Sequence, residues 1–114
     1  MDTARTKRLF TYEEAVALLP EAKRRTEEAV AELESLMSRQ GGEELVQENE
    51  VSSAYQLIVA RWAESILDLG IEVKGLWLID FDSGSGYYCW HYPEPSLQFF
   101  HGYEEGFGGR IRLN

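Results

Sequence analysis

Hydrophobic residues recur at helical spacing up to Gly70, and the spacing changes to that of β-strands afterwards. The helical part is rich in Ala, Leu, Glu and Arg. The later part holds all three tryptophans, both histidines and the only cysteine. The pattern therefore predicts an α+β protein with its chemistry concentrated after Gly70.

The first helix has a clear start and an early proline. Thr11 and Glu14 form a capping-box pattern, in which each side chain can bond the other residue's backbone N–H. Pro20 follows within about two turns, and proline cannot donate a helical hydrogen bond. We predict a short helix over residues 12–18, a break or kink, and a longer helix over residues 20–39.

A further helix is expected to start between Glu43 and Val51 and to stop at Gly70. Each long helix carries one apolar stripe, and a short polar loop joins them, so the two should close as an antiparallel hairpin. Some apolar residues lie off this seam or at its edge, namely Leu45, Leu57, Val59 and Trp62. Either the C-terminal stretch or another subunit covers them, and we expect a homo-oligomer.

Three short strands are predicted after the helices, over residues 76–81, 87–91 and 97–101. Turns rich in Gly, Ser and Pro separate them, which is typical of an antiparallel meander. The tail after Arg110 could pair with this sheet or with a helix.

Short turns would bring Asp80 opposite Cys89 and Cys89 opposite Phe99, with Asp82, Tyr87 and His101 in one row. Because side chains alternate across a strand, one face is almost wholly apolar and should lie on the helices: Trp77, Ile79, Phe81, Tyr88, Trp90 and Phe100. The other face is mixed: Leu78, Asp80, Asp82, Tyr87, Cys89, His91, Leu97, Phe99 and His101.

The mixed face gathers carboxylates, a thiol and imidazoles, which are ligands for zinc or another divalent transition metal. Asp80, Cys89 and His101 are the candidate metal ligands, and His91, two residues from Cys89, could reach the same ion. Alternatively, Cys89 is a small buried hydrophobe and both histidines are strand residues bonded to Asp or Tyr. A mid-strand cysteine without a helix N-terminus disfavours a thiol enzyme.

Glu94 and Arg110 are the candidate ligand-binding residues. Glu94 lies between two prolines on a rigid turn, and Arg110 ends a glycine-rich segment that is no phosphate loop. Arg110 could pair with an acid such as Glu94 or Glu104, or recognise an anionic ligand.

Composition narrows the possible partners. The formal net charge of −9 argues against nucleic acid and against anionic lipid surfaces. One cysteine excludes an internal disulfide, and no apolar run approaches the roughly 20 residues needed to cross a bilayer. We expect a cytoplasmic protein.

The order of several short motifs resembles a family of small bacterial proteins of unknown function, domain of unknown function 2203. The motifs are Phe-Thr-x-Glu-Glu-Ala with Leu-Leu-Pro, then Gly-Ile-Glu-Val-Lys, Ile-Asp-Phe, Cys-Trp, a turn glutamate, an aromatic-His pair and Gly-Phe-x-Gly-Arg. The chain departs from the family pattern at Asp82, Pro93 and Phe100. The resemblance implies no activity, but it singles out five polar residues: Asp80, Cys89, Glu94, His101 and Arg110.

We therefore predict one domain over residues 1–114: a flexible tail (1–9), a kinked helix with a helical hairpin (10–70), and a three-stranded antiparallel meander with a C-terminal loop (71–114). The first functional hypothesis is a non-enzymatic protein that self-associates or binds a partner or small ligand. The second is a metal-binding protein, with zinc as one candidate metal and its site on the mixed sheet face. Whether the protein is an enzyme is left open.

Overall fold

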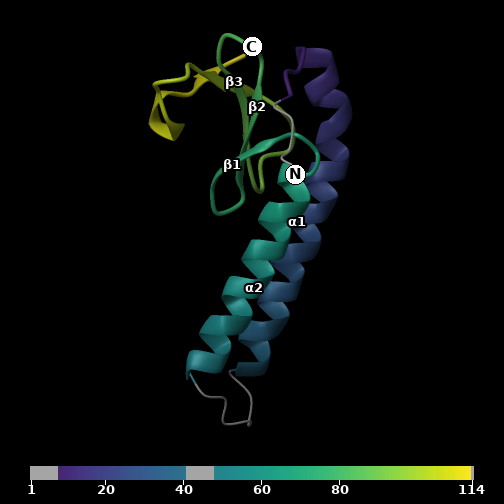
Figure 1. Cartoon of the computed structure of the whole chain (residues 1–114), viewed down its shortest axis with the longest axis vertical. Helices are drawn as coiled ribbons and strands as arrows, with labels where there is room; N and C mark the ends of the chain where they lie inside the picture. The colour runs from purple at the N-terminus through teal and green to yellow at the C-terminus, as the bar shows by residue number, and fades with distance from the viewer. Residues whose placement is uncertain (1–7, 41–47, 114) are drawn as a thin grey trace, which may run out of the picture.

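The computed structural model describes residues 8–40 and 48–113. Two helices, α1 (Tyr12–Gln40) and α2 (Glu48–Leu67), precede a five-stranded antiparallel sheet (Figure 1). The strands follow one another in the sheet as they do in the chain: β1 (Glu72–Gly75), β2 (Leu78–Asp82), β3 (Tyr87–His91), β4 (Phe99–His101) and β5 (Ile111–Arg112). The α+β prediction is confirmed, but the meander has two more strands than the three expected. The short helix η1 (Phe107–Gly109) precedes β5.

The predicted break near Pro20 is wrong, because α1 runs through this residue without interruption, and the alternative of a kink stays a prediction. A proline inside a helix costs about 3 kcal/mol, chiefly through the lost hydrogen bond and a clash with the preceding turn. Burial of Ala15, Leu19 and Ala22 on both sides of Pro20 offsets this cost, because all three belong to the core. The capping box is confirmed: Glu14 N donates to Thr11 Oγ1 (3.1 Å), and Thr11 N donates to Glu14 Oε1 (2.9 Å).

The hairpin seam contains a buried polar contact, and it is satisfied. Trp62 Nε1 donates to Thr26 Oγ1 (2.9 Å), and the Thr26 hydroxyl donates to the carbonyl of Ala22 (2.8 Å). The Trp62 ring also packs edge-on against Trp77, which precedes β2. Trp62 therefore contacts both α1 and the segment before β2, and its ring is not exposed for contact with another subunit.

The apolar sheet face packs into the same core, as predicted. Ile79, Phe81 and Trp90 are fully buried, and Phe81 meets the ring of Phe10. Leu97, predicted on the mixed face, also belongs to this core. The reason is that the strand begins only at Phe99, so alternation does not extend back to Leu97.

The register of the central strands agrees with the prediction. Asp80 lies opposite Cys89, and Cys89 lies opposite Phe99, while Tyr87 lies between Asp82 and His101. Gly86 permits this close approach at the start of β3, because a Cβ there would collide with the ring of Phe100. The cross-strand neighbours on the mixed face are therefore those that the sequence predicted.

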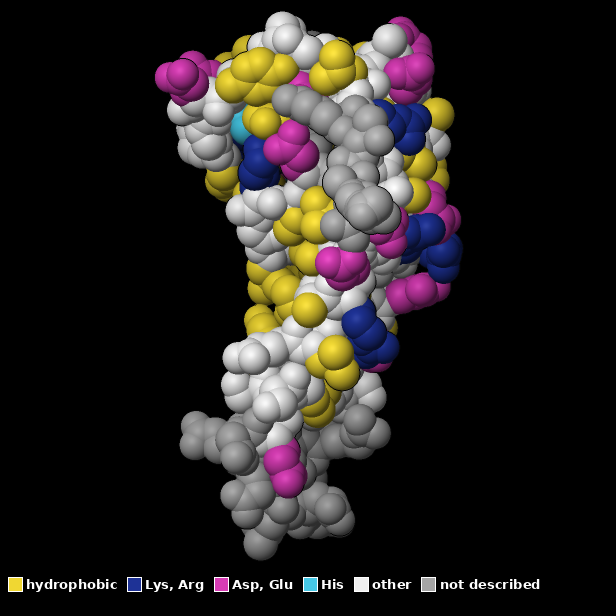
Figure 2. All heavy atoms as spheres, in the orientation of Figure 1, with side chains coloured by type: hydrophobic (Ala, Val, Ile, Leu, Met, Phe, Trp, Pro, Cys, Tyr) yellow, Lys and Arg dark blue, Asp and Glu magenta, His cyan; other side chains and the backbone are white. Residues whose placement is uncertain are grey.

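The far half of the helical hairpin extends beyond the sheet (Figure 1). In the hairpin, Met37 of α1 and Leu57 of α2 are 49% and 57% exposed. On the face drawn in Figure 2, hydrophobic side chains follow the hairpin, and acidic and basic side chains are interspersed. Leu45 lies outside the described residues. Of the described helices, none combines the length and apolar character needed to span a membrane.

Candidate functional site

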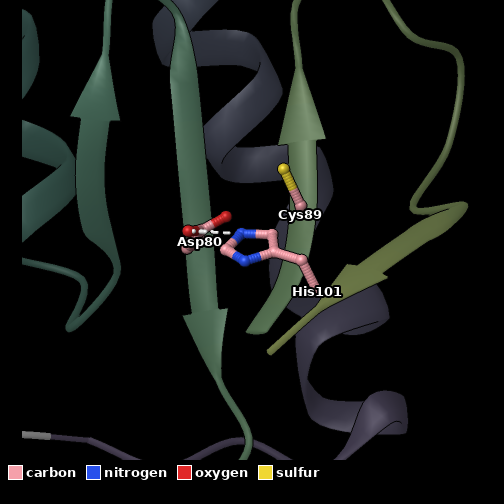
Figure 3. A group of neighbouring side chains, drawn as sticks. All are labelled: Asp80, Cys89 and His101. Carbon is pink, nitrogen blue, oxygen red and sulfur yellow. Dashed lines mark hydrogen bonds and ion pairs between the residues drawn. The ribbon is translucent and has the colours of Figure 1, made fainter. Parts of the chain in front are cut away.

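Asp80, Cys89 and His101 converge from three neighbouring strands, β2, β3 and β4 (Figure 3). One potential ligand atom from each residue lies within 4.8 Å of the other two. All three side chains are buried. Asp80 and Cys89 are direct cross-strand neighbours, and His101 approaches Asp80 diagonally. The sheet therefore presents three different metal-ligand types at one point.

Asp80 is a buried carboxylate whose two oxygens have unequal surroundings. Oδ2 accepts from Lys74 Nζ (3.1 Å) and lies 2.9 Å from His101 Nε2. Oδ1 is buried and has no hydrogen-bond partner among the described residues. A buried acceptor without a partner costs about 1–3 kcal/mol, and more when it is charged. Oδ1 therefore lacks a strong donor among the described residues, and the neighbouring Cys89 thiol is only a weak one.

His101 faces an acceptor at each ring nitrogen. Nδ1 lies 2.9 Å from the carbonyl of Gly102, and Nε2 lies 2.9 Å from Asp80 Oδ2. A neutral imidazole has only one N–H. If Nδ1 donates to the carbonyl, the Nε2 lone pair points at the carboxylate. The pair then requires a proton or another cation between Nε2 and Oδ2.

Cys89 is a protected thiol. Burial raises the pKa of Cys89 to about 12, and Asp80 adds to this effect through its negative charge and as an acceptor for the thiol proton. Arg110 Nη1, 3.9 Å from Sγ, opposes it more weakly. The two imidazole nitrogens of His101 face Asp80 and Gly102, so neither is directed to accept the thiol proton. This geometry disfavours a cysteine nucleophile.

Two other residues of the mixed face lie apart from this cluster. Asp82 Oδ1 accepts from Tyr103 Oη (2.7 Å) and from Gly84 N (2.9 Å), which holds the turn after β2. His91 packs against the ring of Phe107 instead of joining Cys89. Sequence alternation placed five metal-binding groups on one face, and the structure brings three of them together.

Glu94 and Arg110 pair with each other, one of the alternatives predicted. Arg110 Nη1 donates to Glu94 Oε2 (2.7 Å), and Glu94 Oε1 accepts from the backbone N–H of His91 (2.9 Å). The guanidinium lies 4.0 Å from the ring centres of both Phe99 and Phe107. This pair fixes the C-terminal segment beside β3 and β4. A role for Glu94 and Arg110 in ligand binding stays a prediction.

Sequence reasoning missed Lys74. Its ammonium contacts Asp80 and Glu72 Oε1 (3.5 Å) and lies 3.6 Å from the Tyr87 ring centre. Burial alone would lower the pKa of Lys74, but the hydrogen bond to Asp80 and the surrounding negative charge outweigh it, and the pKa is raised. Strand alternation could have predicted this contact. Glu72 pairs with Asp80 and shares its face of the sheet, and Lys74, two residues after Glu72, lies on the same face.

A pocket of about 410 Å³ opens over the cluster. Its wall includes the three candidate ligands, and the remaining lining residues are Lys74, Leu78, Tyr103, Glu104, Glu105, Gly106 and Phe107. The candidate ligands are thus buried but border a space large enough for water and a small molecule.

Fold and site together define a small α+β domain with a buried Asp-Cys-His cluster beneath a pocket. A family model described as "Uncharacterized conserved protein (DUF2203)" matches residues 8–113. The chain belongs to this family, as the order of its motifs predicted. Searches of curated proteins and of solved structures find no match.

Proposed function

We propose that the protein binds a divalent transition metal ion, with zinc the best fit, through Asp80, Cys89 and His101. The observation that carries this proposal is the buried Oδ1 of Asp80, which has no partner among the described residues and lies within a cluster of three ligand types. A metal ion would supply positive charge at Oδ1, in addition to the Lys74 ammonium that already contacts Oδ2. It would also take the Nε2 lone pair of His101.

The surroundings of His101 support the same proposal. Histidines that bind metal usually donate their other ring N–H to a carbonyl or carboxylate, which fixes the tautomer. The Gly102 carbonyl is placed to accept from Nδ1. Nε2 is then free for the metal, and the direct contact with Asp80 would be replaced by coordination.

The dimensions of the cluster are close to those of a zinc site. Ligand atoms on tetrahedral zinc lie about 3.5 Å apart, from bond lengths of about 2.0–2.3 Å. The three atoms here lie within 4.8 Å of one another, so small side-chain rotations would suffice. Mixed nitrogen, oxygen and sulfur ligands favour zinc over magnesium or calcium, which take oxygen ligands.

The direct test is metal binding by tag-free protein. Metal content of the purified protein is measured by mass spectrometry, and zinc is titrated calorimetrically into chelator-treated protein. We expect one zinc ion per chain. Asp80→Asn, Cys89→Ser and His101→Ala should each weaken binding at least tenfold, by analogy with the loss of a supporting metal contact.

His91→Ala is the matched control, because it removes a histidine of the same face that lies outside the cluster. Its zinc affinity should equal that of the wild type. No zinc uptake would refute the proposal, and so would equal weakening by His91→Ala and His101→Ala. In either case the Asp80-His101-Lys74 contacts would be a structural polar network.

The exposed apolar side chains of the hairpin favour a second candidate function, self-association. Met37 of α1 and Leu57 of α2 expose apolar surface. Pairing of two copies through this surface would bury it. Sedimentation of the wild type should show an oligomer that Leu57→Lys converts to a monomer. A wild-type monomer at high micromolar concentration would refute this candidate.

A further inference from the structure

The pocket above the cluster carries an inference about what the site binds, and this inference rests on the proposed metal site. Three protein ligands leave a four-coordinate zinc or cobalt ion with one position for an outside molecule. Asp80, Cys89 and His101 all line the pocket. The open position would therefore face the pocket, where an exchangeable ligand can enter from solvent.

The charges around the pocket select against anions. Glu104 and Glu105 are exposed and line it. Lys74, which also lines it, is paired with Asp80 and Glu72. An Asp80 carboxylate and a Cys89 thiolate would also neutralise a divalent ion. An incoming anion would thus meet negative carboxylates without a net positive metal centre to compensate.

The apolar part of the wall suits a flat ring. Phe107 and Leu78 line the pocket together with the phenol of Tyr103. Phe107 is held by its contacts with His91 and Arg110, which keeps its ring beside β3. Aromatic side chains bind planar rings by stacked or edge-on contacts worth about 0.5–1.5 kcal/mol beyond area burial.

We propose that the pocket admits a neutral, nitrogen-containing aromatic ring as the fourth metal ligand, in preference to a small anion. The metal would bind the ring nitrogen, the aromatic wall would contact the ring, and Glu104 and Glu105 would repel competing anions. The chemical class is that of imidazole and related azoles.

The test uses the intact protein loaded with Co²⁺, whose visible absorption reports each change of ligand. Imidazole and azide are titrated separately. We expect imidazole to shift the bands with saturation, and azide to bind at least tenfold more weakly. Bands that respond to neither probe would show a closed coordination sphere and overturn the inference. Azide binding as tight as imidazole, or complete loss of the bands on adding imidazole, would overturn it too.

Variants without the carboxylates of Glu104 and Glu105 test whether these pocket residues weaken anion binding. Glu104→Gln/Glu105→Gln should tighten azide binding several-fold and leave imidazole unchanged. The amide introduced by Glu105→Gln keeps an oxygen that can accept from Gly102 N, as Glu105 Oε1 does. Glu104→Gln alone tests the point if the double variant folds poorly. Glu27→Gln/Glu28→Gln, on α1, removes the same net charge elsewhere, so an equal effect there would contradict a local role.

Failure of this inference and failure of the proposed metal site are distinguishable. If Co²⁺ produces no bands at all, the metal site itself is refuted, and the inference falls with it. If the bands form and depend on His101 but do not respond to imidazole, the metal site stands and the pocket ligand is refuted.

Discussion

The helical hairpin and the mixed face of the sheet bury polar groups in opposite ways. In the hairpin, the buried hydroxyl of Thr26 both accepts from Trp62 and donates to Ala22. On the sheet, the buried carboxylate of Asp80 keeps one oxygen without a partner among the described residues. The Thr26 hydroxyl is thus satisfied within the hairpin, whereas Asp80 Oδ1 contacts neither Lys74 nor His101, which both lie at Oδ2.

This difference indicates which region contributes mainly to stability and which is the candidate functional site. A satisfied polar contact in a packed seam contributes to folding and requires nothing from outside. A buried carboxylate with an unpaired oxygen reduces stability, and such sites concentrate where proteins bind or react. The hairpin is thus the scaffold, and the face formed by β2, β3 and β4 is the place to look for activity.

The largest expected effect is loss of the scaffold by Trp62→Ala. This change removes a buried ring that packs on Trp77, and it should lower the free energy of unfolding by about 3–5 kcal/mol. Trp62→Phe, the control, keeps much of the packing and loses the bond to Thr26, so about 1 kcal/mol is expected. Urea denaturation measures both. A loss below about 1 kcal/mol for Trp62→Ala would show that the seam is not the main support.

The next largest expected effect is stabilisation by zinc bound at the sheet. Zinc at about 100 times its Kd should raise the free energy of unfolding by about 2.7 kcal/mol. The increment should persist in Trp62→Phe, whose defect lies in the seam, and disappear in His101→Ala, which lacks a proposed ligand. Thermal or urea unfolding with and without zinc measures it. If zinc stabilised His101→Ala as much as the wild type, the zinc would be bound elsewhere. The proposed distinction between a structural hairpin and a metal-binding sheet face would then be wrong.

A smaller effect is expected at the start of α1. Thr11→Ala removes the hydroxyl that accepts from Glu14 N, and N-cap substitutions of this kind cost about 1 kcal/mol. Thr11→Ser keeps the hydroxyl and should be nearly neutral. Both variants should bind zinc as the wild type does, because the cap lies in the scaffold. A change in zinc affinity with either variant would show that helix and site are coupled.

Much of the fold followed from local patterns. The capping box fixed the start of α1, and short turns fixed the pairing of Asp80 with Cys89. Predictions failed where tertiary packing overrides local preference. Pro20 stays within α1 because its neighbours are buried, and Leu97 enters the core because the strand is shorter than the pattern suggested. β5, of two residues, is too short to give a strong period, and the alternation over residues 72–74 in β1 was not assigned to a strand.

Strand alternation predicted the candidate site only as a face, and the family resemblance singled out Asp80, Cys89 and His101 within it. Alternation groups Asp80 with Asp82 and Cys89 with His91, because residues two apart share a side of the sheet. It does not say which of them meet. The diagonal approach of His101 to Asp80 depends on side-chain rotamers and on the Gly102 carbonyl. His91 turns instead to Phe107, a contact between distant segments that no spacing encodes.

The smallest effect tests whether exposed charges matter to the scaffold at all. Hydrogen bonds from Arg24 and, to a smaller extent, from Arg25 lower the pKa of Glu21 from 4.5 to about 2. A depressed carboxylate pKa stabilises the fold above the unfolded value, and this contribution is lost as the pH falls from 4.5 towards 2. Glu21→Gln should therefore be slightly less stable than the wild type at pH 7, and the difference should vanish near pH 2.

Urea midpoints over this pH range, at low salt and at 1 M NaCl, measure the difference. Salt should reduce it, because exposed ion pairs are screened. Glu27→Gln, at an exposed acid of the same helix, is the matched control for loss of one charge. An equal pH dependence in both variants would mean that net charge matters and the pairing with Arg24 and Arg25 does not. The ion pairs of the hairpin would then add nothing specific, and its stability would rest on the packed seam around Trp62.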